Sequence, residues 1–269
     1  DTNAPAFSTW ATAATNIQAA IDAASDGDTV LVAPGTYTAA VTINKNDLTV
    51  QGGRGTLWDA DRTIIDRQGA ANSKGVTFIT ATNSALRGFT VMGAVNGIYV
   101  YKSARSSRIE SCVVRGNATG EGPAIYNDQY NTGILQATVL RNSIVVGNET
   151  SGKAVNHAVR NQGTVNAYAL FVANSIIEAN VPAQLWSRST VYNSVIGEGP
   201  SATDVLYVNV ITNLAGDTTN SVCRLLDIAP ASEGVGTSLV WRGVSAYIPR
   251  MGSLARKNGQ IYAGIATAS

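Results

Sequence analysis

Charged side chains are scarce in this chain of 269 residues. Only 14% of the residues are Asp, Glu, Lys or Arg, compared with about 25% in a typical globular domain. The formal net charge is +1 and no run of Lys and Arg occurs, which argues against nucleic-acid binding because that function needs a basic stripe. Apolar runs fall well short of the roughly 20 residues of a membrane span. We therefore expect no nucleic-acid partner and no membrane span.

Cysteine and histidine are almost missing. Cys112 and Cys223 are the two cysteines, and each is expected to be a small buried residue more readily than half of a disulfide bond, because they lie far apart in the chain. His157 is the single histidine, so any histidine-based catalytic triad must use it. The chain begins at Asp1 without Met or a signal peptide, which fits a mature secreted protein. We expect an extracellular or cell-surface location.

A seven-residue phrase recurs five times and is the strongest signal in the sequence. Its copies are 23, 31, 32 and 19 residues apart and begin at Leu86, Ile109, Leu140, Val172 and Val191. Self-similarity at this period is typical of a solenoid, in which each unit buries its apolar face against its neighbours. The sequence therefore predicts an all-β protein, a parallel β-helix, that forms one domain over 1–269. We expect a cap over 1–29, coils over 30–213 and a capping or wrapping segment over 214–269.

The segments outside the phrase predict one helix and a series of short strands. An apolar stripe at helical spacing predicts a helix over 15–24, with Thr15 or Asn16 as its N-cap. It would cover the open end of the apolar core. Glycines punctuate the chain after it as turns, and no helix-length period follows. Strands are expected at 30–32, 41–43, 48–50, 63–65, 76–79, 206–211, 239–241, 246–248 and 261–265.

Stacking of the phrases places like residues in columns. The first column is apolar, and alternation along a strand puts the third and fifth columns on the same, inward face. The third column holds asparagines that could bond amide to amide along the axis, and the fourth holds serines: Asn142, Asn174, Asn193, Ser143, Ser175, Ser194. Asn117, Asn148 and Asn180 end three phrases, where we expect a turn with left-handed φ. Turn and ladder chemistry is thus the first explanation of these polar residues.

Two insertions, 118–136 and 149–169, gather most of the potentially functional side chains. They leave adjacent rungs, so we expect them to protrude side by side. The candidates for catalysis are His157, Arg160, Tyr126, Tyr130 and Asp128, which could form a neutral-base lyase site or a sugar-binding flank. Candidates for glycan binding are Trp186, Arg188, Lys153 and Glu121. A histidine in a polar loop is more often merely exposed, and Trp186 could equally be a buried corner residue.

Residues 16–37 resemble the N-terminal cap and first coil of the pectin-lyase-like superfamily of right-handed parallel β-helices, and 48–52 and 63–69 resemble its next coils. The tail, with Cys223, 229–236 and 261–264, is similar more loosely to secreted bacterial β-helix repeat proteins. The resemblance implies a right-handed β-helix. It does not fix an activity, because fold does not imply function.

Departures from the enzymes of that superfamily are clear. Gly35-Thr-Tyr-Thr-Ala39 is similar to a pectin methylesterase segment, but Ala39 stands where that segment has an acid. The clustered aspartates and the Gly-His-Gly motif of polygalacturonase-type hydrolases are missing as well. Glycosidases need two carboxyl groups about 5 to 9.5 Å apart, whereas the predicted outward column Arg87, Glu110, Arg141, Ala173, Tyr192 holds one.

A calcium-assisted lyase would need several carboxylates around the metal and a Lys or Arg as base. Asp59, Asp61 and Asp66 are the candidate ligands, and Lys102, Arg105 and Arg108 are the nearby cations. Ordinary turn aspartates and a solvated basic loop explain the same residues more simply. We therefore expect no cofactor, with Ca²⁺ as an unsupported alternative.

The low charge and the polar ladders favour a secreted structural protein that builds a surface, matrix or filament. Self-association, end to end or lateral, is the partner that this hypothesis predicts, because solenoid ends are open sheet edges. One alternative is a polysaccharide lyase or hydrolase that acts on an extended glycan, and another is a carbohydrate-binding adhesin.

Overall fold

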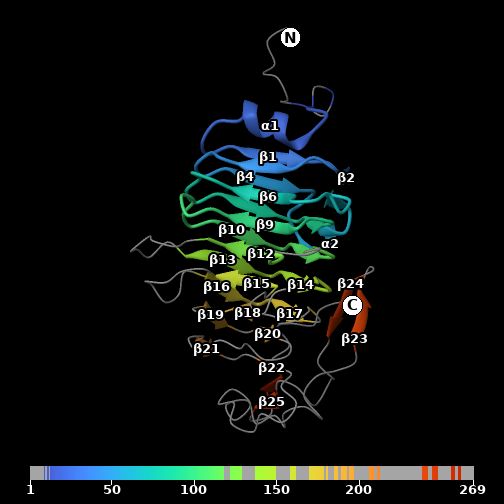
Figure 1. Cartoon of the computed structure of the whole chain (residues 1–269), viewed down its shortest axis with the longest axis vertical. Coiled ribbons are helices and arrows are strands. Elements are labelled where there is room, and N and C mark those ends of the chain that lie inside the picture. The colour runs from blue at the N-terminus through green and yellow to red at the C-terminus, as the bar shows by residue number, and fades with distance from the viewer. Residues whose placement is uncertain are drawn as a thin grey trace.

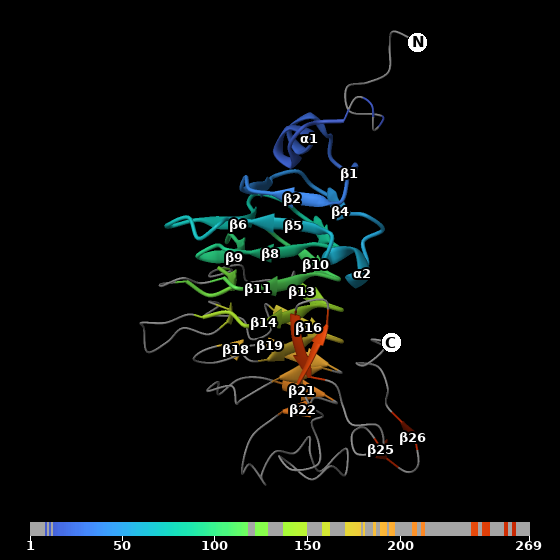
Figure 2. The ribbon, with the colours of Figure 1, turned by 90° about the vertical axis from the view of Figure 1, so that its right-hand side faces the viewer.

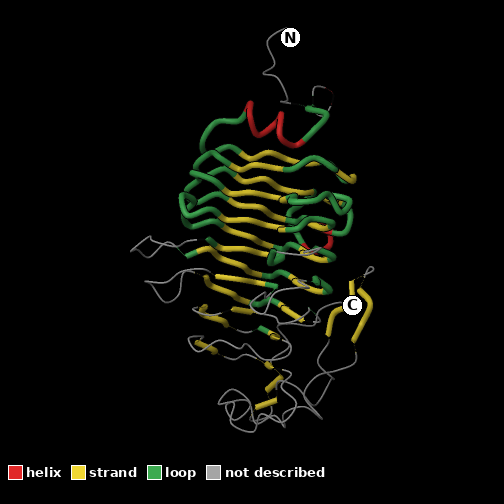
Figure 3. The backbone as a smooth tube through the Cα atoms, viewed as in Figure 1, coloured by secondary structure: helices red, strands yellow, loops and turns green. Residues whose placement is uncertain are grey.

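The computed structural model is a stack of parallel rungs wound into a rod (Figure 1). The rungs succeed one another along the rod from the N-terminal helix downward, and the same order is seen from the side (Figure 2). Strands and turns alternate regularly around the rod (Figure 3). The structure describes residues 9, 11, 13–117, 122–128, 137–149, 158–161, 170–178, 180, 185–186, 189–192, 194–196, 206–208, 211–212, 238–241, 244–247, 256–257 and 260–261.

Three parallel sheets form the walls of the rod, in agreement with the predicted fold class. Sheet A contains β1 (Thr29–Val32), β4 (Thr49–Gly52), β7 (Ala85–Arg87), β10 (Arg108–Glu110), β13 (Thr138–Arg141), β16 (Leu170–Ala173), β19 (Ser189–Tyr192) and β21 (Leu206–Val208). Sheet B contains β2 (Gly35–Tyr37), β5 (Thr63–Asp66), β8 (Thr90–Met92), β11 (Val113–Arg115), β14 (Ile144–Val146), β17 (Ile176–Glu178), β20 (Val195–Ile196) and β22 (Ile211–Thr212). Sheet C contains β3 (Val41–Ile43), β6 (Lys74–Phe78), β9 (Asn96–Val100), β12 (Ile125–Asn127), β15 (Val159–Asn161) and β18 (Leu185–Trp186).

The five phrases stack in register, as the repeat predicts. Ile109 of β10 lies opposite Leu86 on one side and Leu140 on the other, and Leu140 lies opposite Val172. The exposed fraction is 0% for each of these four side chains: Leu86, Ile109, Leu140 and Val172. Each phrase therefore supplies one strand of sheet A and one of sheet B. Further along the chain β23 (Ser238–Trp241) with β24 (Val244–Tyr247), and β25 (Arg256–Lys257) with β26 (Gln260–Ile261), are antiparallel pairs.

The prediction of an inward ladder of Asn142, Asn174 and Asn193 is wrong for the residues that the structure describes, because they lie at the corner between sheets A and B. Gly88, Ser111, Asn142 and Asn174 occupy this corner with φ of 74°, 52°, 51° and 48°, and both asparagines are exposed. A left-handed residue interrupts the alternation of the strand, so the next residue, not this one, points inward. Asn174 does reach Asn142 at 3.4 Å, but on the outer surface. Asn193 lies outside the described residues.

The serine column is the one that points into the core. Ser143, Ser175 and Ser194 are at most 1% exposed. The N–H groups of Cys112, Ser143 and Ser175 each donate to the Oγ of the serine on the next rung, at 3.1, 3.2 and 3.1 Å. The shift at the corner also moves two residues of the fifth column, Val113 and Ile144, outward. Val113 and Ile144 pack outside the main core, against Ala60 and Leu57.

A second correction concerns the asparagines that end the phrases. Asn117, Asn148 and Asn180 were expected in left-handed turns, but none has positive φ and each is at most 4% exposed. They form an amide ladder in the interior of the rod. The amide of Asn148 donates to Asn180 Oδ1 at 2.8 Å and to the Val114 carbonyl at 3.0 Å. The two groups of asparagines have thus exchanged the roles that the sequence assigned to them.

The predicted cap helix is present as α1 (Ile17–Ala23), and Asn16 is its N-cap, because Asn16 Oδ1 accepts from the Ala19 N–H at 2.8 Å. A second, four-residue helix, α2 (Leu57–Ala60), was not expected. It lies on the outer side of sheet B. No helix in the described part of the chain is long and apolar enough to span a membrane.

Several glycines expected as turns lie within strands, namely Gly35 in β2, Gly52 in β4 and Gly75 in β6. A Cβ at Gly75 would lie 2.6 Å from the carbonyl oxygen of Gly97 on the next rung, so this position needs glycine for close approach. The two insertions also contain strands: β12 lies within 118–136 and β15 within 149–169. The described middle of each insertion therefore belongs to sheet C and does not protrude.

Cys112 is free and buried, as the more favoured expectation had it, while Cys223 lies outside the described residues. Burial raises the pKa of the Cys112 thiol to about 12. The thiol is thus a buried group whose reactive thiolate form is scarce at neutral pH.

Candidate functional site

The outer face of sheet C carries a column of aromatic and cationic residues. Thr77, Tyr99 and Tyr126 lie opposite one another on β6, β9 and β12. Arg160 of β15 and Trp186 of β18 continue the column. The side chains of Tyr99, Tyr126 and Arg160 point outward because their neighbours along the strands, such as Ile98 and Val100, are fully buried and side chains alternate across a strand. Parallel pairing in register therefore builds the column.

The tyrosines of this face contact one another. The ring centroid of Tyr99 is 4.5 Å from that of Tyr101 and 4.9 Å from that of Tyr126, and the second pair meets edge to face at 86°. Two cations lie over these rings. Lys74 Nζ is 4.9 Å from the Tyr99 centroid and 5.6 Å from that of Tyr101, and the Arg160 guanidinium is 5.5 Å from that of Tyr126. All three distances are within the range of cation–π attraction.

Asp128 fixes one of these rings. The hydroxyl of Tyr99 donates to Asp128 Oδ2 at 2.9 Å. Burial, together with this hydrogen bond and the charge of Asp128, raises the pKa of Tyr99 well above its ordinary value. The pKa of Tyr126 is raised too, mainly by burial, with Asp128 raising it further and Arg160 lowering it. Both phenols therefore hold their protons more tightly than a free tyrosine does.

The structure brings together three of the catalytic candidates that the sequence singled out: Tyr126, Asp128 and Arg160. It does so by strand pairing, not by contact between protruding loops. Trp186 lies next to Arg160 in the strand register, and only its backbone is described. The other candidates, for catalysis and glycan binding alike, lie outside the described residues: His157, Tyr130, Arg188, Lys153 and Glu121.

Tyr99, Tyr101 and Lys74 belong to the site although sequence reasoning missed them. A signal was present. Four short segments share one pattern: a small residue, an apolar residue, an outward residue and an inward residue. They are Gly75-Val-Thr-Phe, Gly97-Ile-Tyr-Val, Ala124-Ile-Tyr-Asn and Ala158-Val-Arg-Asn. This second, shorter phrase marks sheet C, and its third position gives the outward column directly.

The aspartates proposed for calcium do not converge. Asp59 accepts from the Thr56 hydroxyl at 2.7 Å, and Asp66 Oδ1 accepts from the Gln68 N–H at 2.8 Å. Within the part of the chain that the structure describes, no group of three or more His, Cys, Asp or Glu side chains could hold a metal ion. Asp59 and Asp66 thus accept hydrogen bonds from residues three and two positions away in the chain.

The outward column of sheet A holds one carboxylate, as predicted. Glu110 lies between Arg87 and Arg141, with Oε2 2.6 Å from Arg87 and Oε1 2.9 Å from Arg141. Its side chain is only 3% exposed. Among the described residues of this column no second acid stands at glycosidase distance. The group is an ion-paired structural element.

Comparison with solved structures defines the fold class. The chain matches a pectin methylesterase from Yersinia enterocolitica with a TM-score of 0.54 and 13% identity, over 76% of this chain and 92% of that one. It matches pectin methylesterase PemA from Erwinia chrysanthemi with a TM-score of 0.51 and 12% identity, over 79% and 89%. No protein-family model and no curated protein sequence matches the chain.

The chain therefore has the pectin-lyase-like right-handed parallel β-helix fold, as the resemblance of residues 16–37 implied. Identities this low establish the fold alone. The function of the outer face of sheet C depends on its own residues.

Proposed function

We propose that the outer face of sheet C binds an extended polysaccharide, which lies along the rod and across successive rungs. The observation that carries this proposal is the group of Tyr99, Tyr101 and Tyr126 in ring contact, flanked by Lys74 and Arg160. Aromatic rings offer apolar faces to sugar rings and hydroxyls to their polar edges. Rungs follow one another at about 4.8 Å, close to the length of one sugar unit.

Charge on this face favours acidic sugars. Lys74 and Arg160 supply two positive charges beside the rings, whereas Asp128 supplies one negative charge that is engaged with Tyr99. Arginine pairs well with a carboxylate, in a bidentate way. The names of the two matched methylesterases make pectin a first polysaccharide to test.

Cleavage of the bound chain is the second candidate function, since the matched folds include enzymes. Two observations favour binding over chemistry. Asp128 is the one carboxylate that the described residues place in contact with the ring group, while hydrolysis of a glycosidic bond uses a pair. The raised pKa of both Tyr99 and Tyr126 leaves neither phenol ionised as a base near neutral pH.

A binding experiment tests the proposal directly. Affinity electrophoresis and calorimetry with polygalacturonate, methylated pectin, alginate and neutral glycans should show binding to at least one acidic polymer. Tyr99→Ala, Tyr126→Ala and Lys74→Ala should each weaken it about tenfold, the equivalent of about 1.4 kcal/mol. Trp58→Ala and Arg54→Ala remove an exposed aromatic and a cation near α2, and should leave binding unchanged.

The outcomes separate the alternatives. Binding without unsaturated or reducing products supports a binding protein, whereas product release that Arg160→Ala abolishes supports a lyase or hydrolase. Lack of binding across the whole panel, or equal weakening by the two control variants, contradicts the site on sheet C. Secretion is proposed alongside this function and is tested separately by locating the native protein.

A further inference from the structure

Strand β1 is the open edge of sheet A at the N-terminal end of the rod. It pairs with β4 on one side, and sheet A begins with it. The N–H of Thr49 donates to the Asp28 carbonyl and the N–H of Gly53 to the Val32 carbonyl. The backbone N–H and C=O groups of Val30 and Val32 thus point toward β4. In a parallel pair the alternate residues, Thr29 and Leu31, direct their backbone N–H and C=O groups to the other side, away from β4.

Within the described part of the chain, this edge lacks the protection that sheet C has at the same end. The side chain of Gln18 from α1 closes the edge of β3, because its Oε1 accepts from the Thr42 N–H at 2.7 Å and its Nε2 donates to the Thr42 carbonyl at 3.3 Å. One amide thereby takes the place of a neighbouring strand. β1 has no such partner among the described residues, nor a proline or a charged residue of its own. Proteins normally block edges with such features.

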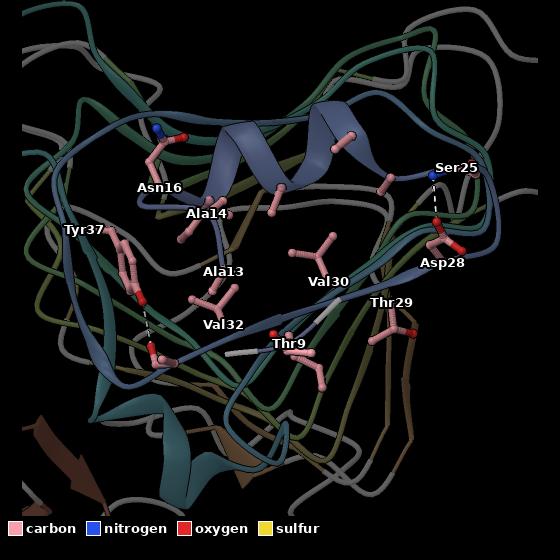
Figure 4. A pocket seen from close by; sticks show the side chains of 16 residues that line it. Thr9, Ala13, Ala14, Asn16, Ser25, Asp28, Thr29, Val30, Val32 and Tyr37 are labelled. Atoms are coloured by element: carbon pink, nitrogen blue, oxygen red, sulfur yellow. Dashed lines mark hydrogen bonds between the residues drawn. The ribbon is translucent and has the colours of Figure 1, made fainter. Parts of the chain in front are cut away.

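Beside the edge lies a cleft of about 790 Å³ between α1 and β1. Figure 4 shows the side chains of Val30 and Val32 turned toward α1, which lies to one side of the strand. Tyr37 and Ala14 line the same cleft. On the outer side, Leu31 is 54% exposed, and the other large hydrophobic side chain that is similarly exposed in the described part of the chain is Trp58, at 43%. The edge strand thus has apolar surface on both faces.

We propose that this edge binds a second copy of the chain, so that β21 of one molecule pairs with β1 of the next. Both strands belong to sheet A, one at each end of it, and every pairing within that sheet is parallel. A second copy placed head to tail therefore continues the sheet without any change of direction. By sequence, Thr29–Val32 and Leu206–Val208 carry no charged residue, so no like charges oppose the contact. Such a contact is heterologous and yields open filaments.

The test compares two variants that each replace an exposed apolar residue by lysine. Leu31→Lys places a charge on the edge strand, and Trp58→Lys places one on α2, away from it. Sedimentation velocity and negative-stain electron microscopy of the full chain, from dilute to concentrated solution, should show growing end-to-end species. Leu31→Lys should weaken this association about tenfold, the equivalent of about 1.4 kcal/mol, while Trp58→Lys and the melting temperature of both variants stay near wild type.

A wild-type chain that is monomeric at every concentration overturns the proposal. So does association that both variants weaken equally, which would indicate non-specific contact of apolar surface. A monomer whose melting temperature falls in Leu31→Lys alone would show that the chain's own residues cover the edge, and it would overturn the proposal too. These measurements need no polysaccharide, so their outcome is independent of the binding proposed for sheet C.

Discussion

Asn117 is bound to Asn148 twice: its backbone N–H and its side-chain Nδ2 donate to the same Oδ1, at 3.0 and 3.2 Å. Asn148 repeats this arrangement on Asn180, at 3.0 and 2.8 Å. Each amide thus receives two hydrogen bonds from the rung before it. The interior of the rod is therefore held by a chain of polar contacts that runs along its axis, as well as by apolar packing.

Asn148→Ala should lower the free energy of unfolding by about 2 to 6 kcal/mol. The change leaves the Asn117 N–H and the Val114 carbonyl without the partner they have now, and each unpaired buried group costs about 1 to 3 kcal/mol. Urea denaturation followed by circular dichroism measures the difference.

The control is Asn142, an asparagine one corner away that is exposed and has φ of 51°. Asn142→Gly should be close to neutral, because glycine adopts this conformation freely, and Asn142→Ala should cost about 1 kcal/mol. An effect of Asn142→Ala as large as that of Asn148→Ala would contradict the exchange of roles between the two groups of asparagines.

Glu110→Gln should destabilise the protein by about 1 to 3 kcal/mol, since it removes the charge that two arginines share in a buried place. Arg141→Ala should cost at most about 1 kcal/mol, because its side chain is half exposed and screened by solvent. Denaturation at low and at high salt checks this, and the cost of Glu110→Gln should change less with salt than that of an exposed pair.

Cys112 should resist alkylation in the folded protein. Burial raises the pKa of its thiol to about 12, so the reactive thiolate is scarce at pH 8. The experiment uses a Cys223→Ser background and compares iodoacetamide labelling with and without denaturant. Rapid labelling of the native protein would show that this part of the core opens readily.

We expect the protein to lose stability at high pH because of the tyrosines of sheet C. The pKa of Tyr99 and that of Tyr126 are raised in the folded state, so the unfolded chain releases these protons first, near the ordinary value of 10.0. The contribution of these two raised pKa values to the free energy of unfolding is fully present below that pH, and it is lost as the pH rises above it. A Tyr99→Phe, Tyr126→Phe double variant should show a smaller decline of melting temperature between neutral and strongly alkaline pH.

The repeat made sheets A and B predictable because two of their strands fall within a single phrase. Columns such as Leu86, Ile109 and Leu140 could be aligned without gaps, and their burial followed. The left-handed corner could not be located by alternation alone, since one residue with positive φ reverses the inward direction of all that follow. That is why Ser143 rather than Asn142 faces the core.

Sheet C was harder to predict because its strands lie among segments of unequal length. Tyr126 and Arg160 were identified as candidates by their chemistry, and a meeting of two loops was the expected reason for their contact. Lys74 and Tyr99 lie far earlier in the chain and reach the same face only through strand pairing. The composition of a single segment does not predict that pairing, whereas an alignment of the second phrase does.

One-to-one pairing between rungs has a consequence for how this molecule tolerates change in length. Adding or losing one residue within a strand exchanges its inward and outward side chains, and the ladders of Asn117 and Ser143 would break at that point. Adding or losing a whole turn shifts every later strand by one rung and leaves each facing an equivalent partner. The turn, rather than the residue, is thus the unit in which the rod can grow or shrink.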